Sequence, residues 1–343
     1  MKYLSVCSGI EAATVAWHGL GWEPVAFSEI EKFPSAVLAH HYPSVPNWGD
    51  MTKFQEWPDA NVDVLVGGTP CQSFSVAGLR KGLDDPRGNL MLTYGAIAKR
   101  YRPKWVVFEN VPGLLSSNGG RDFGTLLGML GELGYGFAYR VLDAQFVRTR
   151  QHPRAVPQRR RRVFVVGCLG DWRSAAAVLF DRESLSGIAE PSRKTQQKNA
   201  NFDLCGVEIC GPVSARDYKD PGTDKMNKNS AKMVPVFPMH GGMVNRKEKN
   251  GPGGTGFGEE NSSSYTLTAG GMVKHGVVIA KKIRQLTPLE YERLQGFSDN
   301  YTKISWRKKT EPPDAPRYKA LGNSMAVNCM RWIGERIQQV EAL

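Results

Sequence analysis

One cysteine of this sequence stands where a thiol could act on a substrate. Residues 67–75, with the sequence GGTPCQSFS, place Cys71 directly after a short apolar run. Such runs favour strands buried on both faces, and α/β sheets bind their ligands at the carboxyl ends of the strands. Pro70 stiffens the chain before the thiol, and a turn rich in Gln and Ser is an unusual place for a core cysteine. We therefore interpret Cys71 as a candidate nucleophile.

A carboxyl group follows the next apolar run along the chain. Glu109 comes directly after residues 105–108, which read as a strand. If this strand neighbours the one before Cys71, the thiol and the acid emerge at the same edge of the sheet and face one substrate. A glutamate at the end of a strand is also common on protein surfaces. Glu109 alone therefore leaves both interpretations open.

Placing Cys71 and Glu109 at one sheet edge requires neighbouring strands in an α/β fold, and the apolar pattern of the sequence predicts such a fold. Helix-length stretches, for example residues 10–20 and 89–100, alternate with short runs rich in Val, Leu and Phe. This alternation predicts a mostly parallel sheet covered by helices. The runs that predict strands are residues 3–7, 62–67, 105–108 and 163–167.

Regular structure resumes near the C-terminus after a loop-rich middle. Thr287 can cap a helix that Pro288 begins. A final helix is expected over about residues 324–340, with one apolar face that packs in the core. That face consists of Val327, Met330, Ile333, Ile337 and Val340.

The middle of the chain differs from both ends in its amino-acid composition. Gly, Pro, Asn and Lys in residues 211–264 leave no helical or strand period. A structureless loop of this length is uncommon, so we expect either a functional lobe or partial disorder. Strand-like residues 265–268 and 277–281 favour a lobe. Residues 148–162 hold seven arginines, which are typical of a polyanion contact or of a solvated face.

Bulk composition narrows the class of partner and the compartment. The chain has 343 residues, 41% of them hydrophobic, and a net charge of +12, which favours nucleic acid as a partner and a membrane surface second. Glu11 interrupts the short apolar start before a signal peptide or spanning helix could form, so we expect a soluble cytoplasmic protein. Of the six cysteines only Cys205 and Cys210 lie close together, so we expect neither a metal site nor a disulfide framework.

The first predicted strand leads into a candidate ligand loop. Residues 7–11 (CSGIE) follow this strand and open a helix, and Gly9 lets the backbone approach a ligand closely. Glu29 ends the second strand about twenty residues further on, where an acidic residue suits the hydroxyl groups of a ribose, and Ile30 lies beside it.

These motifs resemble those of the DNA cytosine-5 methyltransferase family. Residues 70–72 and 109–111 resemble its two catalytic motifs, and the others occur in the expected order at residues 158–162, 284–288 and 322–324. The resemblance covers residues 1–167 and 284–343. It implies a Rossmann-like methyltransferase domain built from both ends of the chain, with a target-recognition lobe at residues 168–283.

The resemblance also implies a reaction on duplex DNA by a monomer that flips its target base. Carbon 5 of cytosine is not nucleophilic, so the Cys71 thiolate first adds to carbon 6. Glu109, hydrogen-bonded at ring nitrogen 3, stabilises the enamine that accepts the methyl group of S-adenosylmethionine. By the same resemblance Arg160 and Arg162 point into the site, with Arg162 near the oxygen of the base. Arg159 and Arg161 are expected to meet phosphate or solvent.

Further positions are assigned by resemblance alone. The family pattern has an aromatic residue where this chain has Cys7, and glycines where it has Glu11 and Ala12. Residues 72–88 resemble the mobile loop that closes on DNA. DNA contacts are expected from Gln72, Ser75, Arg87, Thr266 and Leu267. The cofactor is expected to contact Ser8, Gly9, Ile10, Glu29, Ile30, Asp50, Met51, Pro70, Leu90, Asn323 and Ser324.

Four other functions fit this sequence less well than cytosine-5 methylation. The RNA-methylating branch of this fold family has a smaller insert and a Cys-Phe-Thr signature, which this sequence lacks. Enzymes that methylate amino groups carry an Asp/Asn/Ser-Pro-Pro-aromatic tetrapeptide, and the nearest string, residues 311–314 (EPPD), lacks the aromatic residue. The presence of Cys71 and Glu109 argues against a regulator without activity. A dehydrogenase would need a Gly-x-Gly-x-x-Gly loop after the first strand.

Overall fold

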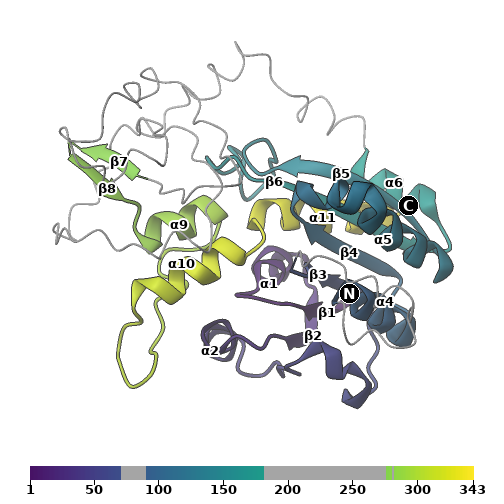
Figure 1. Cartoon of the computed structure of the whole chain (residues 1–343), viewed down its shortest axis with the longest axis horizontal. Coiled ribbons are helices and arrows are strands. Elements are labelled where there is room, and N and C mark those ends of the chain that lie inside the picture. Colours follow the sequence, from purple (N-terminus) through teal and green to yellow (C-terminus); the bar gives the residue numbers. More distant parts are fainter. Residues whose placement is uncertain (71–89, 181–275, 280–281) are drawn as a thin grey trace, which may run out of the picture.

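A six-stranded mixed sheet forms the centre of the molecule (Figure 1). The structure is a computed structural model that describes residues 1–70, 90–180, 276–279 and 282–343. The strand order is β2-β1-β3-β4-β6-β5, with the first four strands parallel and β6 antiparallel to both of its neighbours. The strands are β1 (Lys2–Val6), β2 (Glu23–Ser28), β3 (Val64–Gly67), β4 (Trp105–Asn110), β5 (Tyr135–Asp143) and β6 (Arg161–Leu169).

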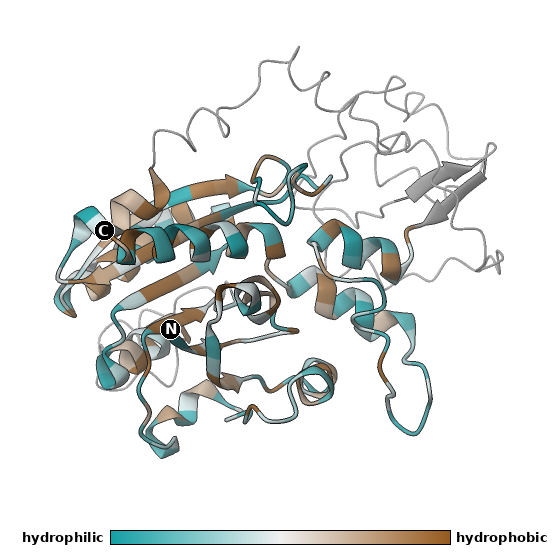
Figure 2. Ribbon diagram, turned by 180° about the vertical axis from the view of Figure 1, so that it is seen from behind, coloured by the Kyte–Doolittle hydropathy of each residue, from teal (hydrophilic) through white to brown (hydrophobic). Residues whose placement is uncertain are grey.

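Helices cover both faces of this sheet, as the alternating pattern predicts. Alternate strand residues face two separate cores, because successive side chains of a strand point to opposite faces. The inner strands of the sheet are mostly apolar, whereas the helices turn a hydrophilic side outward (Figure 2). One core contains residues of α1 (Ala12–Trp17), α6 (Trp172–Leu179) and α11 (Val327–Glu341). The other contains residues of α4 (Leu90–Tyr101) and α5 (Arg121–Glu132).

The apolar runs at residues 3–7, 62–67, 105–108 and 163–167 are strands β1, β3, β4 and β6, and the predicted second strand before Glu29 is β2. The sequence pattern did not reveal β5, which is the edge strand and has only three buried residues among its nine. It therefore lacks the continuous apolar run that marks a doubly covered strand. The short 3-10 turns of the structure are His18–Leu20, Met51–Glu56, Pro112–Leu115 and Ser117–Gly120.

The C-terminal helix packs against the start of the chain. The Trp17 indole nitrogen donates to the Met330 carbonyl at 2.8 Å, and an Arg331 guanidinium nitrogen donates to the Ala16 carbonyl at 3.0 Å. The predicted apolar face of α11 is buried at Val327, Met330, Ile333 and Ile337 and partly buried at Val340. Helix α6, which begins within the predicted recognition lobe of residues 168–283, also packs in this core.

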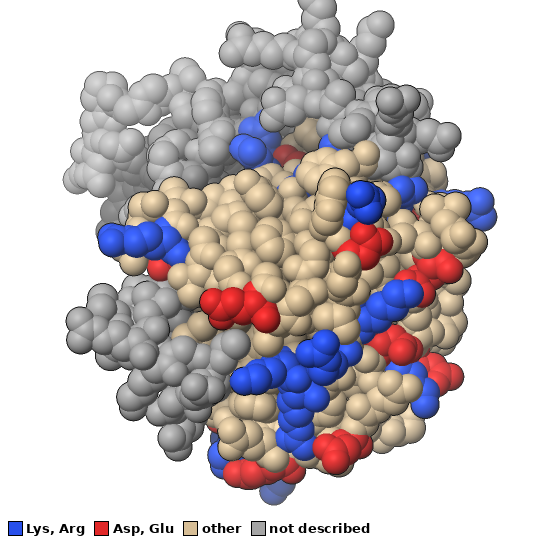
Figure 3. All heavy atoms as spheres, turned by 90° about the vertical axis from the view of Figure 1, so that its right-hand side faces the viewer, with Lys and Arg blue, Asp and Glu red and all other residues tan. Residues whose placement is uncertain are grey.

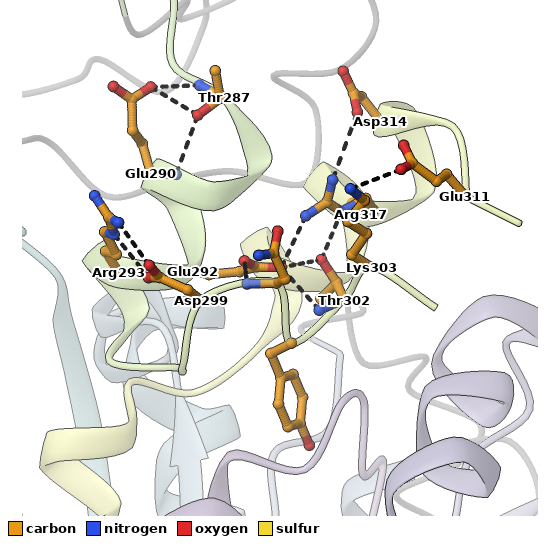
Figure 4. Close-up of polar contacts among 12 residues, drawn as sticks. Thr287, Glu290, Glu292, Arg293, Asp299, Thr302, Lys303, Glu311, Asp314 and Arg317 are labelled. Atoms are coloured by element: carbon orange, nitrogen blue, oxygen red, sulfur yellow. Dashed lines mark hydrogen bonds and ion pairs between the residues drawn. The ribbon is translucent and has the colours of Figure 1, made fainter. Parts of the chain in front are cut away.

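A smaller unit is built around one buried carboxylate. It comprises β7 (Gly276–Ile279), β8 (Lys282–Gln285), α9 (Pro288–Gln295) and α10 (Asp314–Asn323), and the predicted Thr287 cap is confirmed as a capping box with Glu290. The Glu292 side chain is fully buried and accepts hydrogen bonds from the Thr302 amide and hydroxyl and from Arg317 (Figure 4). This network fixes the loop after α9. From this loop the Tyr301 hydroxyl donates to the Ile10 carbonyl, in the turn after β1, at 2.8 Å. Helix α10 contacts α2 (Lys32–His41).

Every helix in the described segments is too short or too polar to cross a membrane.

Candidate active site

Strands β3 and β4 bring the two predicted catalytic motifs to one edge. They are parallel neighbours, with Gly67 opposite Phe108, so the next residues of both strands emerge together. A Cβ atom on Gly68 would lie 2.9 Å from the backbone and side-chain oxygens of Glu109, and only glycine allows this approach. The side-chain amide nitrogen of Asn110, Nδ2, donates to the Thr69 backbone carbonyl at 3.0 Å. This bond ties the Glu109 strand to the segment that leads to Cys71.

Cys71 and several other predicted residues fall beyond these strands. Pro70 is described and exposed at the end of the segment. Leu90 is the first residue of α4 and is half-buried against the core. The predicted nucleophile and all the predicted DNA contacts lie outside the described residues, namely Cys71, Gln72, Ser75, Arg87, Thr266 and Leu267.

Glu109 is a largely buried acid with an arginine beside it. Its side chain is 12% exposed, and one of its oxygens lies 3.2 Å from the Arg162 Nε atom. Burial raises the pKa of Glu109, and the charges of Arg162 and Arg160 offset part of the rise. A carboxyl with a raised pKa can hold a proton at higher pH than an exposed one, as a hydrogen-bond donor to a ring nitrogen requires.

Arg160 supports the wall of the site. The residue is 2% exposed, and one guanidinium nitrogen donates to the Gly322 carbonyl at 3.2 Å and to the Ser324 carbonyl at 2.5 Å. Burial, with the nearby charge of Arg162, lowers its pKa to about 9. Arg160 thus holds the turn between α10 and α11, and its predicted contact with substrate stays a prediction.

A cavity opens at this edge between the two ends of the chain. The predicted cofactor residues Ser8 and Gly9 line it together with Asn323 and Ser324, and Glu109 lines it from β4. The site therefore combines residues more than 300 positions apart in sequence. Its other lining residues are Ser5, Cys7, Glu11, Ala12, Ala13, Val66, Gly68 and Met325.

The loop after β1 has a left-handed backbone that opens it toward a ligand. Gly9 has φ of 59°, and no atom lies within 4 Å of the place where a Cβ would be. Its amide donates to the Glu29 carboxylate at 2.8 Å. Burial raises the pKa of Glu29, against the effect of backbone donors that include Gly9. Ile30, beside it, is apolar and 70% exposed. The Glu29 carboxylate thus lies beside the backbone of Gly9, which a ligand can approach closely, and the exposed side chain of Ile30 follows Glu29 in sequence.

The other predicted cofactor positions flank this loop. Asp50 caps the 3-10 turn by accepting from the Thr52 amide at 2.9 Å, and the Cys7 sulfur lies 3.4 Å from the sulfur of Met51. Burial, with the charges of Glu29 and Asp50, raises the pKa of the Cys7 thiol to about 12. The Ile10 side chain is fully buried, and its carbonyl accepts from the Tyr301 hydroxyl at 2.8 Å.

The sequence and the fold of this chain both have relatives among known proteins. The model of the C-5 cytosine-specific DNA methylase family matches residues 1–339. The chain belongs to this family. A type II methyltransferase, M1.ScrFI of Lactococcus lactis subsp. cremoris, is 32% identical over 99% of this chain and 78% of its own length. The S. pombe Dnmt2 methyltransferase shares the fold over the full length of both chains, with a TM-score of 0.58 and 14% identity.

Another relative of this methylase chain carries a different description. A protein of Escherichia phage P1, named a DNA N-6-adenine-methyltransferase, is 33% identical over 98% of this chain. The chain spans 61% of the length of that relative. Family membership thus confirms the resemblance found from the motifs, and it leaves the choice of target base to the site and to experiment.

The charged surface of this family member is uneven. On the face drawn in Figure 3 basic and acidic side chains both occur around a broad uncharged area. The loop before β6 exposes Arg148, Arg150 and Arg154, and at the start of β6 Arg161 is exposed while Arg159 is half-buried. In the described segments, no group of three or more His, Cys, Asp or Glu side chains could hold a metal ion.

Proposed function

We propose that this protein transfers a methyl group from S-adenosylmethionine to carbon 5 of cytosine in a specific duplex DNA sequence, through a covalent adduct of Cys71. The observation that carries the proposal is the buried Glu109 carboxyl, which shares a cavity with the loop after β1 and lies beside the segment leading to Cys71. Family membership supports the same reaction class.

Each residue has a defined task in this reaction. The Cys71 thiolate adds to carbon 6 of a flipped cytosine while protonated Glu109 donates a hydrogen bond to ring nitrogen 3. Carbon 5 then carries the electron pair that takes the methyl group, and loss of the carbon-5 proton expels the thiolate. Arg162 orients the Glu109 carboxyl from 3.2 Å, and by resemblance it faces the oxygen of the base. Arg160 positions the C-terminal wall of the cavity.

The residues around the cavity fit S-adenosylmethionine, which supplies an electrophilic methyl group on a sulfonium when bound. The open backbone at Gly9 leaves room for close approach of a ligand. Glu29 suits ribose hydroxyls, and the exposed Ile30 offers an apolar surface for a flat base. The remaining positions proposed to contact it are Ser8, Ile10, Asp50, Met51, Pro70, Leu90, Asn323 and Ser324.

We propose that the chain between α6 and β8, within residues 168–283, selects the DNA sequence and takes no part in the chemistry. The composition of residues 211–264 supports this, because Gly, Asn and Lys suit groove contacts. Thr266 and Leu267 would flank the flipped nucleotide, and Gln72, Ser75 and Arg87 would meet DNA from the closing loop. The test replaces the insert with that of a relative of other specificity and sequences methylated DNA. Methylation that stays at the original site would assign recognition to the catalytic domain.

A mechanism-based trap tests the covalent step. Duplex DNA that carries 5-fluorocytosine at the target site should form a denaturant-resistant adduct with the full chain and S-adenosylmethionine, because fluorine blocks the final elimination. The Cys71→Ser variant is the matched control and should form none. Absence of an adduct from the wild type, under conditions in which ordinary DNA is methylated, would contradict covalent catalysis.

A second candidate is methylation of the amino group of adenine, which the name of the phage P1 relative suggests. An amino group is already nucleophilic and needs neither a thiol nor an acid at a ring nitrogen. Mass spectrometry of nucleosides from DNA methylated by the purified chain separates the two. We expect 5-methylcytosine, and N6-methyladenine as the product would instead establish the second candidate.

A further inference from the structure

A second buried carboxyl lines the same cavity. Glu11 is 1% exposed and has φ of 64°, a left-handed conformation that is uncommon for a residue other than glycine. Its oxygens accept hydrogen bonds from the Ser5 hydroxyl, from the Thr14 amide at 3.0 Å and from the Thr14 hydroxyl at 2.5 Å. It also caps helix α1. The position is thus held from three sides at the floor of the cavity.

Glu11 differs from Glu109 and Glu292 in having no cation beside it. Glu109 lies next to Arg162, and Glu292 is paired with Arg317 at 3.0 Å. Within the described part of the chain, no Lys, Arg or His forms an ion pair with Glu11. The charged group that affects it is Glu29, which is also acidic. A buried carboxylate without a counter-charge is costly, and a bound cation would relieve that cost.

We propose that Glu11 makes this cavity prefer the positively charged methyl donor to its neutral reaction product. The inference rests on the proposed function, because S-adenosylmethionine carries a sulfonium and S-adenosylhomocysteine does not. Glu11 and Glu109 line one cavity, and the methyl group must lie near Glu109 for transfer. The sulfonium therefore lies in the field of the Glu11 carboxylate, and at low effective dielectric this attraction is worth a tenfold difference or more in affinity.

Burial and hydrogen bonding shift the pKa of Glu11 in opposite directions, and burial has the larger effect. Burial raises the pKa of this carboxyl, while the hydrogen bonds from Ser5 and Thr14 lower it again. The other titratable groups that act on it are Tyr3 on β1, Tyr42 after α2 and Tyr301, whose pKa values are all raised by burial. These phenols stay neutral, so none of them supplies the missing positive charge.

Calorimetry of the full-length protein tests the proposal without any turnover. Glu11→Gln keeps the shape of the side chain and an acceptor oxygen for Thr14 but removes the charge. We expect its Kd for S-adenosylmethionine to rise about tenfold and its Kd for S-adenosylhomocysteine to stay within about twofold. Glu29→Gln is the matched control, and it should weaken both ligands equally because both contain the same ribose. Equal losses for both ligands in Glu11→Gln would overturn the proposal.

A second measurement covers the case in which Glu11→Gln fails to fold. The ratio of the two Kd values is followed from pH 8 to pH 5 in the wild type and in Glu109→Gln. The preference for S-adenosylmethionine should decline on acidification in both proteins as Glu11 takes up a proton. A ratio independent of pH, or a decline absent from Glu109→Gln, would contradict the proposal. A wild type that binds neither ligand would overturn the proposed function itself.

Discussion

Two carboxyl groups of the same type line one cavity but have different partners. Glu109 comes from β4, in the middle of the sheet, and has Arg162 at 3.2 Å. Glu11 comes from the loop after β1, and its partners are the hydroxyls of Ser5 and Thr14 and one amide. Beside Glu109, the charge of Arg162 offsets part of the pKa rise that burial causes. Around Glu11, only neutral donors oppose the effect of burial, so no neighbouring cation balances this acid when it is ionised.

The largest effect is expected when the nucleophile that follows β3 is removed and the two carboxyl groups are left intact. Cys71→Ser should lower methyl transfer by on the order of 10³-fold or more, because an alkoxide forms far less readily than a thiolate. Binding of duplex DNA and of the cofactor should persist, since only the covalent step is removed. Single-turnover methylation and a gel-shift assay measure the two properties. Full activity in this variant would sink the covalent mechanism.

Glu109→Gln tests whether the carboxyl group of β4 acts as the acid at ring nitrogen 3. The amide still accepts a hydrogen bond from Arg162, but it is no acid for ring nitrogen 3. We expect kcat to fall by roughly 10²- to 10⁴-fold, the usual contribution of general acid–base catalysis. The Kd for S-adenosylmethionine should change by about twofold or less. Equal losses in kcat and in cofactor binding would mean that Glu109 has a structural role.

The sequence predicted what depends on short apolar runs and on strand ends. The runs at residues 3–7 and 62–67 became β1 and β3, and the position of Glu109 at the end of a strand put it at the predicted edge. Strand direction has no such signal, so nothing indicated that β6 runs antiparallel to β4. The edge strand β5 escaped notice because partial burial breaks up its apolar run.

Only the resemblance predicted that Asn323 and Ser324 share a site with the loop after β1, because contacts between distant segments leave no local pattern in the sequence. The hydrogen bonds of Arg160 to the carbonyls of Gly322 and Ser324 join positions more than 160 residues apart. The resemblance had Arg160 point into the site and Arg161 meet phosphate or solvent, and in the structure Arg160 is buried and Arg161 is exposed. Glu11 stood out in the sequence only as a departure from the family's glycine. Its burial and its missing counter-charge emerge only when β1, α1 and β4 are assembled.

Glu29 is a third acid near the cavity, and we expect it to bind the ribose of the cofactor. The carboxylate of this third acid accepts a hydrogen bond from the Gly9 amide at 2.8 Å, next to the proposed ribose position. Glu29→Ala should weaken S-adenosylmethionine by about 1 to 3 kcal/mol, the cost of leaving ribose hydroxyls and a backbone amide unpaired. Calorimetry measures this, and kcat at saturating cofactor should change little. Unchanged affinity would reject the assignment of Glu29 to the ribose.

The smallest expected effect concerns stability, where the two acids should differ in degree. Burial raises the pKa of Glu11 and of Glu109 above the ordinary value of 4.5, so the folded protein binds more protons than the unfolded chain between the two values. The free energy of unfolding therefore falls as pH rises through this window, by about 1.4 kcal/mol for each unit of pKa shift. Glu11→Gln and Glu109→Gln remove this decline. Because Arg162 already compensates Glu109, we expect Glu11→Gln to gain more stability at pH 7 relative to pH 4. Urea unfolding of the ligand-free proteins at both pH values measures the gains, and a larger gain for Glu109→Gln would show that Arg162 does not compensate its neighbour.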